Sequence, residues 1–227
     1  MKKSLLFLMC TLAGLLFVPA GTFANEAAVN GLRQVQQYNF SIHILAMLLV
    51  GFGFLMVFVK KYGYSATTGT YLVVAVGLPV YMFLRSTGAL SSEAFPADSI
   101  KSLLFAEFAV AAALIAMGAV LGRLKLHQYG LLALIIVPAY MVNEWLVLDG
   151  GLGITKGFQD SAGSIIIHAF GAYFGLGLAM AFTKKEDLNA AIDSDETSDR
   201  FSMVGSMVLW LFWPSFCSAI VPAEQFQ

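Results

Sequence analysis

The sequence predicts an all-α fold, a polytopic membrane bundle of about six transmembrane helices that follow a signal peptide. Of the 227 residues, 59% are hydrophobic and 12% are charged, so the apolar share exceeds that of an ordinary soluble domain. The charges are also segregated, because long stretches carry none and the short stretches between them carry nearly all. A helix in lipid satisfies its own backbone, whereas each buried charge costs roughly 3 kcal/mol, so this pattern is typical of a multi-span membrane protein.

The first predicted element is a signal peptide over residues 1–24. The basic start MKK precedes the apolar core SLLFLMCTLAGLLFV, and PAGTFAN offers small residues for cleavage after Ala24. An uncleaved anchor is the alternative. A signal peptide followed by NEAAVNGLRQVQQYNF puts the mature N-terminus outside the cytoplasm.

Six later segments are long and apolar enough to cross a bilayer. They cover residues 41–59, 65–85, 100–122, 127–148, 162–182 and 202–221. The predicted cytoplasmic segments hold Lys60, Lys61, Arg123, Lys125, Lys184, Lys185 and Arg200, whereas the outer ones hold Arg33, Arg85, Lys101 and Lys156. The excess of basic residues inside agrees with an N-terminus outside the cytoplasm, in a multi-pass protein of the cell inner (plasma) membrane.

Charge and motif content exclude several classes of function. The formal net charge of −1 gives no reason to expect a nucleic-acid partner. The sequence has no phosphate-binding glycine loop and no Cys/His cluster with metal-ligand spacing, so we expect no cofactor and no metal. The two cysteines, Cys10 and Cys217, lie in separate hydrophobic segments and do not form a disulfide framework.

The segment DSAGSIIIHAFGAYFG, residues 160–175, places an imidazole in an apolar span. If residues 161–182 form a regular helix, one face collects small or polar side chains. These are Ser161, Ser164, His168, Gly171, Ala172 and Gly175. Two glycines four apart permit close helix approach, so His168 should face packed protein or a narrow lumen. Such a residue is a candidate functional group. The alternative is a neutral core histidine bonded to a carbonyl or serine of a neighbouring helix.

Other polar and aromatic residues are predicted to gather toward the outer level. Asp160 is expected to cap the helix that carries His168, and it could also attract a cation. Glu144 closes the fourth span, and Glu107 lies beside Phe108 in the third. In the sixth span Pro214 should bend the helix just before Phe216. Phe108 and Phe216 could form a narrow aromatic gate, or belong to interfacial packing.

Four stretches resemble the Rh branch of the ammonium transporter/Rh superfamily. They are HILAMLLVGFGFLMVFVKKYGY, FAEFAVAAALIAMGAVLG, DSAGSIIIHAFGAYFG and SDRFSMVGSMVLWLFWPSFCSA, which follow in order between about residues 38 and 220. The resemblance implies the N-terminal half of an eleven-span, inverted-repeat ammonium transporter fold. It also implies homotrimers with one hydrophobic pore in each protomer, through which ammonia derived from ammonium crosses the lipid bilayer. Such a protein is a transporter or channel and not an enzyme.

The resemblance also implies roles for single residues. Phe108 and Phe216 match the outer phenylalanine gate, and His168 matches the first of two histidines that line the pore. Asp160 matches the acidic residue below the outer vestibule, and Glu144 resembles a vestibule acid of Rh members. Leu148 stands where the Amt branch usually has a tryptophan, which favours the Rh branch and implies weaker cation recruitment.

The resemblance divides the chain into the signal peptide, a first five-helix repeat over residues 25–183, a cytoplasmic loop over 184–200, and a sixth helix over 201–227 that starts the second repeat. We expect a truncated or partial chain, a separately encoded second half, or pairing of the chain with itself. Alternative functions are a channel for a small neutral gas such as carbon dioxide, or a non-conducting ammonium sensor or interaction subunit. A further alternative is a proton-coupled carrier that uses Glu107, Asp160 and His168.

Overall fold

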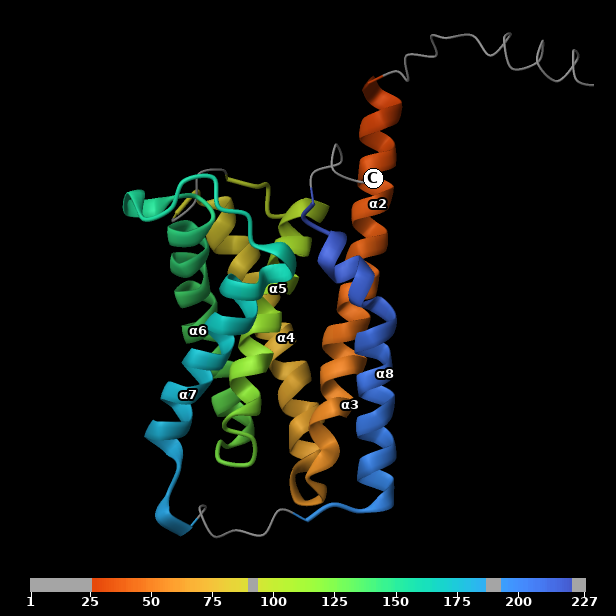
Figure 1. Cartoon of the computed structure of the whole chain (residues 1–227), viewed down its shortest axis with the longest axis vertical. Coiled ribbons are helices and arrows are strands. Elements are labelled where there is room, and N and C mark those ends of the chain that lie inside the picture. Colours follow the sequence, from red (N-terminus) through yellow and green to blue (C-terminus); the bar gives the residue numbers. More distant parts are fainter. Residues whose placement is uncertain (1–25, 90–93, 187–192, 222–227) are drawn as a thin grey trace, which may run out of the picture. The chain divides into compact units, whose positions relative to one another are not determined.

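The computed structural model describes residues 26–89, 94–186 and 193–221 (Figure 1). Regular structure in these ranges is helical throughout, and six helices are long and apolar enough to cross a membrane. The predicted all-α, polytopic architecture is confirmed. The chain divides into two units, residues 1–35 and 36–227, and the bundle discussed below belongs to the second. The predicted signal peptide lies outside the described residues.

The helices follow the order of the predicted spans. They are α2 (Glu26–Ala46), the π-helix η1 (Met47–Phe52), α3 (Gly53–Leu55), the 3-10 turns η2 (Met56–Phe58) and η3 (Lys60–Tyr62), α4 (Gly63–Ser86), α5 (Ile100–Gly118), α6 (Leu126–Val147), the 3-10 turns η4 (Gly151–Gly153) and η5 (Ser161–Gly163), the π-helix η6 (Ser164–Ala169), α7 (Phe170–Phe182) and α8 (Glu196–Ser218). Every predicted span overlaps one of the six candidate membrane helices.

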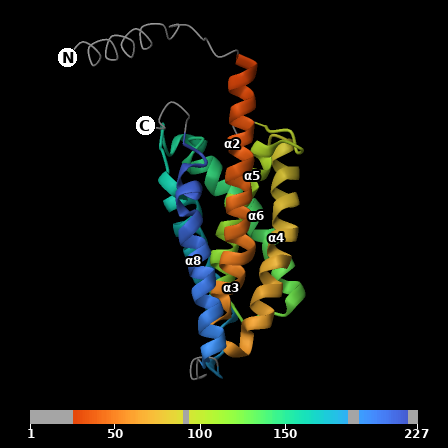
Figure 2. The same cartoon turned by 90° about the vertical axis from the view of Figure 1, so that its right-hand side faces the viewer.

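Helix α5 forms the centre of the second unit. It contacts α4, α6 and α7, and it is the most buried of the six spans. Its alanines at 106, 109, 111, 112, 113 and 116 are buried, and such small side chains let neighbouring helices approach closely. Figure 2 shows α8 beside α3, in agreement with the contacts between α8 and both η1 and α3.

Helix α8 begins inside the segment 184–200 that was predicted to be a loop. The carboxylate of Asp195 accepts a hydrogen bond of 2.8 Å from the Ser198 amide and pairs with Lys60 Nζ at 3.1 Å. The hydrogen bond from the Ser198 amide makes the largest contribution, and together with the Lys60 contact it lowers the pKa of Asp195 to about 2. The cap is therefore present above the ordinary pKa of an aspartate and is lost only as the pH falls through about 2.

The fifth span is not the regular helix that was predicted from residue 161. Ala162 and Gly163 have φ angles of 54° and 66°, and η6 is π-helical before α7 begins at Phe170. The close helix approach predicted from the small residues is present in α7. A Cβ atom on Gly171 would lie 2.8 Å from the Ala112 carbonyl oxygen of α5, so only glycine permits this approach. The predicted periodicity therefore holds for α7 but not for the segment around His168.

Candidate functional site

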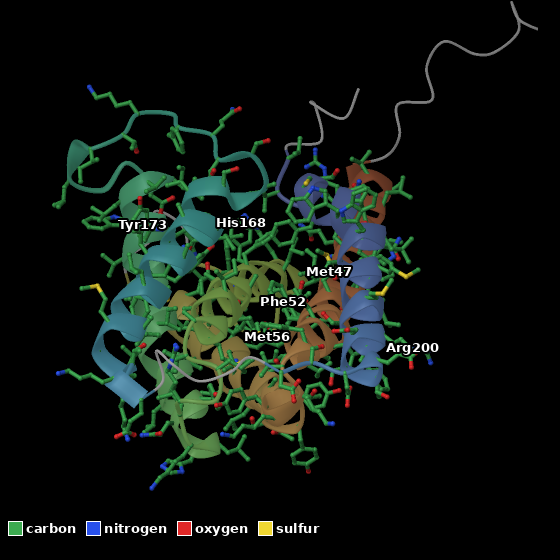
Figure 3. All side chains as sticks on the ribbon, turned by 60° about the horizontal axis from the view of Figure 1, so that its bottom comes forward. Met47, Phe52, Met56, His168, Tyr173 and Arg200 are labelled. Carbon is green, nitrogen blue, oxygen red and sulfur yellow. The ribbon has the colours of Figure 1, made fainter. Side chains whose placement is uncertain are left out.

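An apolar cavity of 330 Å³ lies between α2, η1, α5, η6 and α8. Its lining residues are Ile44, Met47, Leu48, Phe52, Ala111, Ile115, Ile167, His168, Leu209, Trp213 and Phe216. Both π-helices contribute to the wall, η1 through Met47 and Phe52 and η6 through His168. Figure 3 shows Met47 and Phe52 in the interior of the bundle and Tyr173 on its outside. Because π-helical turns are rare and often occur at functional sites, their convergence here marks the cavity as the candidate site.

The structure brings the two predicted gate phenylalanines together. Phe108 of α5 and Phe216 of α8 have ring centroids 5.1 Å apart at an interplanar angle of 76°, and both are buried. We call these two residues the aromatic pair. The edge of Phe216 also meets His168 at 6.0 Å and its face stacks on Trp213 at 5.5 Å. The aromatic pair thus continues directly into the rings that line the cavity.

One ring nitrogen of His168 is hydrogen-bonded to a nearby backbone carbonyl. Its Nδ1 lies 3.2 Å from the Gly163 carbonyl oxygen, which can only accept, so Nδ1 carries a proton and donates. In the neutral ring Nε2 is then an acceptor, and within the described residues it has no hydrogen-bond partner. The ring is half-buried and meets the Trp213 indole edge to face at 5.9 Å. A small molecule with an N–H or O–H group could donate to Nε2.

Asp160 caps the segment that carries His168, as predicted, but at a different place. Its carboxylate accepts from the amide of Ile165 at 2.9 Å and from the amide of Ile166 at 2.8 Å. These amides belong to the π-helix η6 and not to a first α-helical turn at residues 161–163. The regular helix predicted from residue 161 is therefore interrupted before His168, because Ala162 and Gly163 have left-handed backbone angles.

Glu144 is buried in an ion pair and does not line the cavity. Its Oε2 lies 3.2 Å from Arg85 Nη1 and accepts a hydrogen bond of 2.8 Å from the Tyr81 hydroxyl. The Arg85 guanidinium also lies 4.6 Å from the centre of the Phe95 ring. The side chains of Arg85 and Glu144 are only 5% and 2% exposed. The pair joins α4 to α6 in the interior of the second unit, and the vestibule role that the resemblance implies for Glu144 stays a prediction.

Two polar contacts next to the aromatic pair are not among the predictions made from the sequence. Ser41 of α2 donates to the carboxylate of Glu107, and Nδ1 of His43 lies 2.8 Å from the Ser215 hydroxyl. The signal was present in the sequence, because Ser41 and His43 are polar residues at the start of the apolar span predicted over residues 41–59. What the sequence lacks is the identity of their partners, which lie far along the chain.

The described ranges contain no group of three His, Cys, Asp or Glu side chains placed to hold a metal ion. The chemistry offered by the cavity is therefore that of aromatic faces, apolar walls and one imidazole acceptor.

Comparison with known proteins gives consistent matches. The family model for the Ammonium Transporter Family matches residues 1–226. The ammonium transporter Rh type C of Xenopus tropicalis is 36% identical over 181 residues, which cover 79% of this chain and 37% of the relative. The ammonium transporter Rh type A of Rattus norvegicus is 39% identical over 197 residues, which cover 85% of this chain and 42% of the relative. The chain thus spans about two fifths of the length of these curated relatives.

Solved structures also match, among them the following one. It is described as Nitrosomonas europaea Rh50 and the mechanism of conduction by the Rhesus protein family of channels. The match has a TM-score of 0.84 and 67% sequence identity, and it covers 86% of this chain and 52% of that chain.

Proposed function

This chain belongs to the ammonium transporter family, and from that premise we propose that it forms part of an Rh-type pathway through which ammonia, derived from ammonium, crosses a membrane. The observation that carries the proposal is the aromatic pair, which meets His168 at the edge of an apolar cavity. The six candidate spans and the family make the chain an integral membrane protein.

The physical chemistry of the cavity favours a neutral molecule over a cation. Its walls are apolar, and a charge within a membrane span is costly unless it is paired. Ammonium would give its proton to water on the outer side of the aromatic pair, where ring faces attract a cation. Ammonia could then pass the pair and donate an N–H to the free Nε2 of His168. The width of the opening and the lack of charge in the walls would set selectivity.

The remaining predicted residues act in this proposal by holding the site in place. Asp160 fixes the backbone of η6, and with it His168, through the amides of Ile165 and Ile166. Glu144 joins α4 to α6 through Arg85. We further propose a non-enzymatic, homotrimeric, multi-pass protein of the plasma membrane with its N-terminus outside the cytoplasm, in line with the family and the distribution of basic residues.

Flux through proteoliposomes tests the proposal. The 227-residue chain would be reconstituted alone and also joined to the remaining part of the Nitrosomonas europaea Rh50 chain, and ammonia uptake followed by the rise in luminal pH. Replacing His168→Ala should lower uptake by about fivefold, the worth of one neutral hydrogen bond. His127→Ala removes an exposed imidazole on α6 and serves as the matched control. If His168→Ala transports ammonia as fast as His127→Ala in every form that shows uptake, the role of His168 is refuted.

A further inference from the structure

Helix α2 contacts the two neighbours of the aromatic pair. Ser41 bonds Glu107, which directly precedes Phe108, and His43 bonds Ser215, which directly precedes Phe216. Residues two apart on a helix project about 200° from one another, so one helix can reach α5 with the first side chain and α8 with the second. Two polar contacts from one turn of α2 therefore end beside the two rings that form the aromatic pair.

His43 contacts α8 on both sides of Pro214, where the backbone hydrogen bonding of the helix is interrupted. Pro214 lies inside this helix and carries no amide hydrogen, so the helix lacks a backbone hydrogen bond there. Figure 1 shows α8 changing direction toward its C-terminal end. The His43 ring stacks on Phe212 with centroids 4.7 Å apart and an interplanar angle of 18°, while its Nδ1 bonds Ser215. His43 thus contacts α8 both before and after the proline.

The orientation of Phe216 depends on this bent end of α8. Its ring is 4% exposed and touches Phe108, His168 and Trp213. A rotation of the helix after Pro214 would move Phe216 relative to Phe108, because Phe216 follows the proline on α8 whereas Phe108 lies on α5. We propose that His43 is a positioning residue that sets the distance between the two rings of the aromatic pair. This proposal extends the proposed transport function by naming what holds the gate.

Trp213 provides a readout that does not require transport. In a background of Trp145→Phe and Trp210→Phe, Trp213 is the sole tryptophan and reports on the ring of Phe216 stacked against it. His43→Phe keeps an aromatic ring against Phe212 but loses the hydrogen bond, and Ser215→Ala removes the other partner. Each should shift the Trp213 emission maximum, and the double variant should shift it no further. Ser206→Ala removes an exposed hydroxyl that bonds within α8 and should leave the emission unchanged. Unchanged emission in both His43→Phe and Ser215→Ala overturns the positioning role.

The transport assay separates this proposal from the gate itself. In the reconstituted protein, His43→Phe should raise the ratio of methylammonium to ammonia uptake by about threefold, because the loss of one hydrogen bond within a membrane protein loosens the opening by a small factor. If Phe216→Ala changes this ratio and His43→Phe does not, the gate stands and the positioning role falls. If Trp213 responds to His43→Phe while Phe216→Ala leaves the ratio unchanged, the positioning contact stands and the proposed gate falls.

Discussion

One carboxylate and one glycine together set the backbone around His168. Asp160 accepts the amides of Ile165 and Ile166, and this holds the start of η6 against the preceding turn. Gly163 lies between them with a φ of 66°, and a Cβ atom there would lie 2.3 Å from the Cδ1 of Ile167. The left-handed glycine directs its carbonyl to the imidazole, so the proton on Nδ1 of His168 is fixed by local backbone geometry.

Replacement of Asp160 separates its capping role from a charge role. Asp160→Ala should lower the free energy of unfolding by about 1 kcal/mol, because the amides of η6 lose their acceptor. Asp160→Asn keeps one oxygen acceptor and should recover most of the loss in a thermal unfolding assay. Asp98→Ala, at an exposed position ahead of α5, is the control and should be neutral. Equal loss in the alanine and asparagine variants would point to the charge and contradict the cap.

The aromatic rings of the candidate site could be predicted from the sequence, whereas the ion pair of Arg85 and Glu144 could not. Phe108, Phe216 and His168 stand in stretches with a recognisable family pattern, and the structure places them together. Glu144 was interpreted without its partner, because Arg85 lies 59 residues earlier and no periodicity relates the two. A long-range pair of this kind depends on how helices pack, and that information is not contained in local spacing.

Helix α8 approaches the backbone of η1 and α3 closely at Gly205. A Cβ atom on Gly205 would lie 2.3 Å from the Leu55 amide nitrogen and 2.6 Å from the Gly51 carbonyl oxygen. Ser202, one turn earlier, donates to the Leu55 carbonyl at 3.1 Å. Because the atoms that a side chain would meet belong to the backbone, they cannot move aside singly. Small residues of this kind are typical where membrane helices approach closely.

Gly205→Ala should therefore push α8 away from its neighbour. We expect a loss of about 1–3 kcal/mol in the free energy of unfolding, the usual cost of overfilling a packed contact. Gly177→Ala, in α7, meets no atom within 4 Å and is the matched control. Alanine favours helix over glycine, so the control should be neutral or slightly stabilising when both variants are compared by thermal unfolding in detergent. A Gly205→Ala protein as stable as the Gly177→Ala protein would contradict the close approach.

The buried pair of Arg85 and Glu144 joins α4 to α6, and its removal should be costly. Glu144→Gln leaves the guanidinium without a counter-charge, and we expect a loss of about 3–5 kcal/mol in the free energy of unfolding. Arg85→Leu combined with Glu144→Gln removes both charges and should recover much of that loss. Glu196→Gln breaks an exposed pair with Arg200 and should cost less than about 1 kcal/mol. A loss in Glu144→Gln no greater than in Glu196→Gln would show that the pair is not buried in the membrane protein.

At the element scale, length and apolarity were sufficient to place the six spans, because each helix must cross the same thickness of lipid. They were not sufficient inside the fifth span. There the side chain of Asp160 and the left-handed Gly163 override the helical period, and the chain forms a π-helix before α7. The start of α8 at Glu196 was also missed, because its Asp195 cap lies in a charged stretch that was interpreted as loop.

For the whole molecule, the cavity lies beside the two least buried spans. The spans that contain α7 and α8 expose large apolar side chains, among them Tyr173, Met180, Met207, Trp210 and Leu211. The chain covers 52% of the Rh50 chain that it matches. The proposed path for ammonia follows the described wall of the cavity, with the aromatic pair at one edge and His168 beside it.

We propose that a neutral molecule, and not a cation, passes the aromatic pair and His168. The most direct measurement follows luminal pH and electrical current together when ammonium is added to proteoliposomes on a sensor surface, with the reconstituted form of the chain that supports uptake. The account predicts a rise in luminal pH without a sustained current, because the proton stays outside while ammonia crosses. A sustained current that grows in proportion to the uptake would contradict it, since the charge would then have crossed the apolar cavity with the substrate.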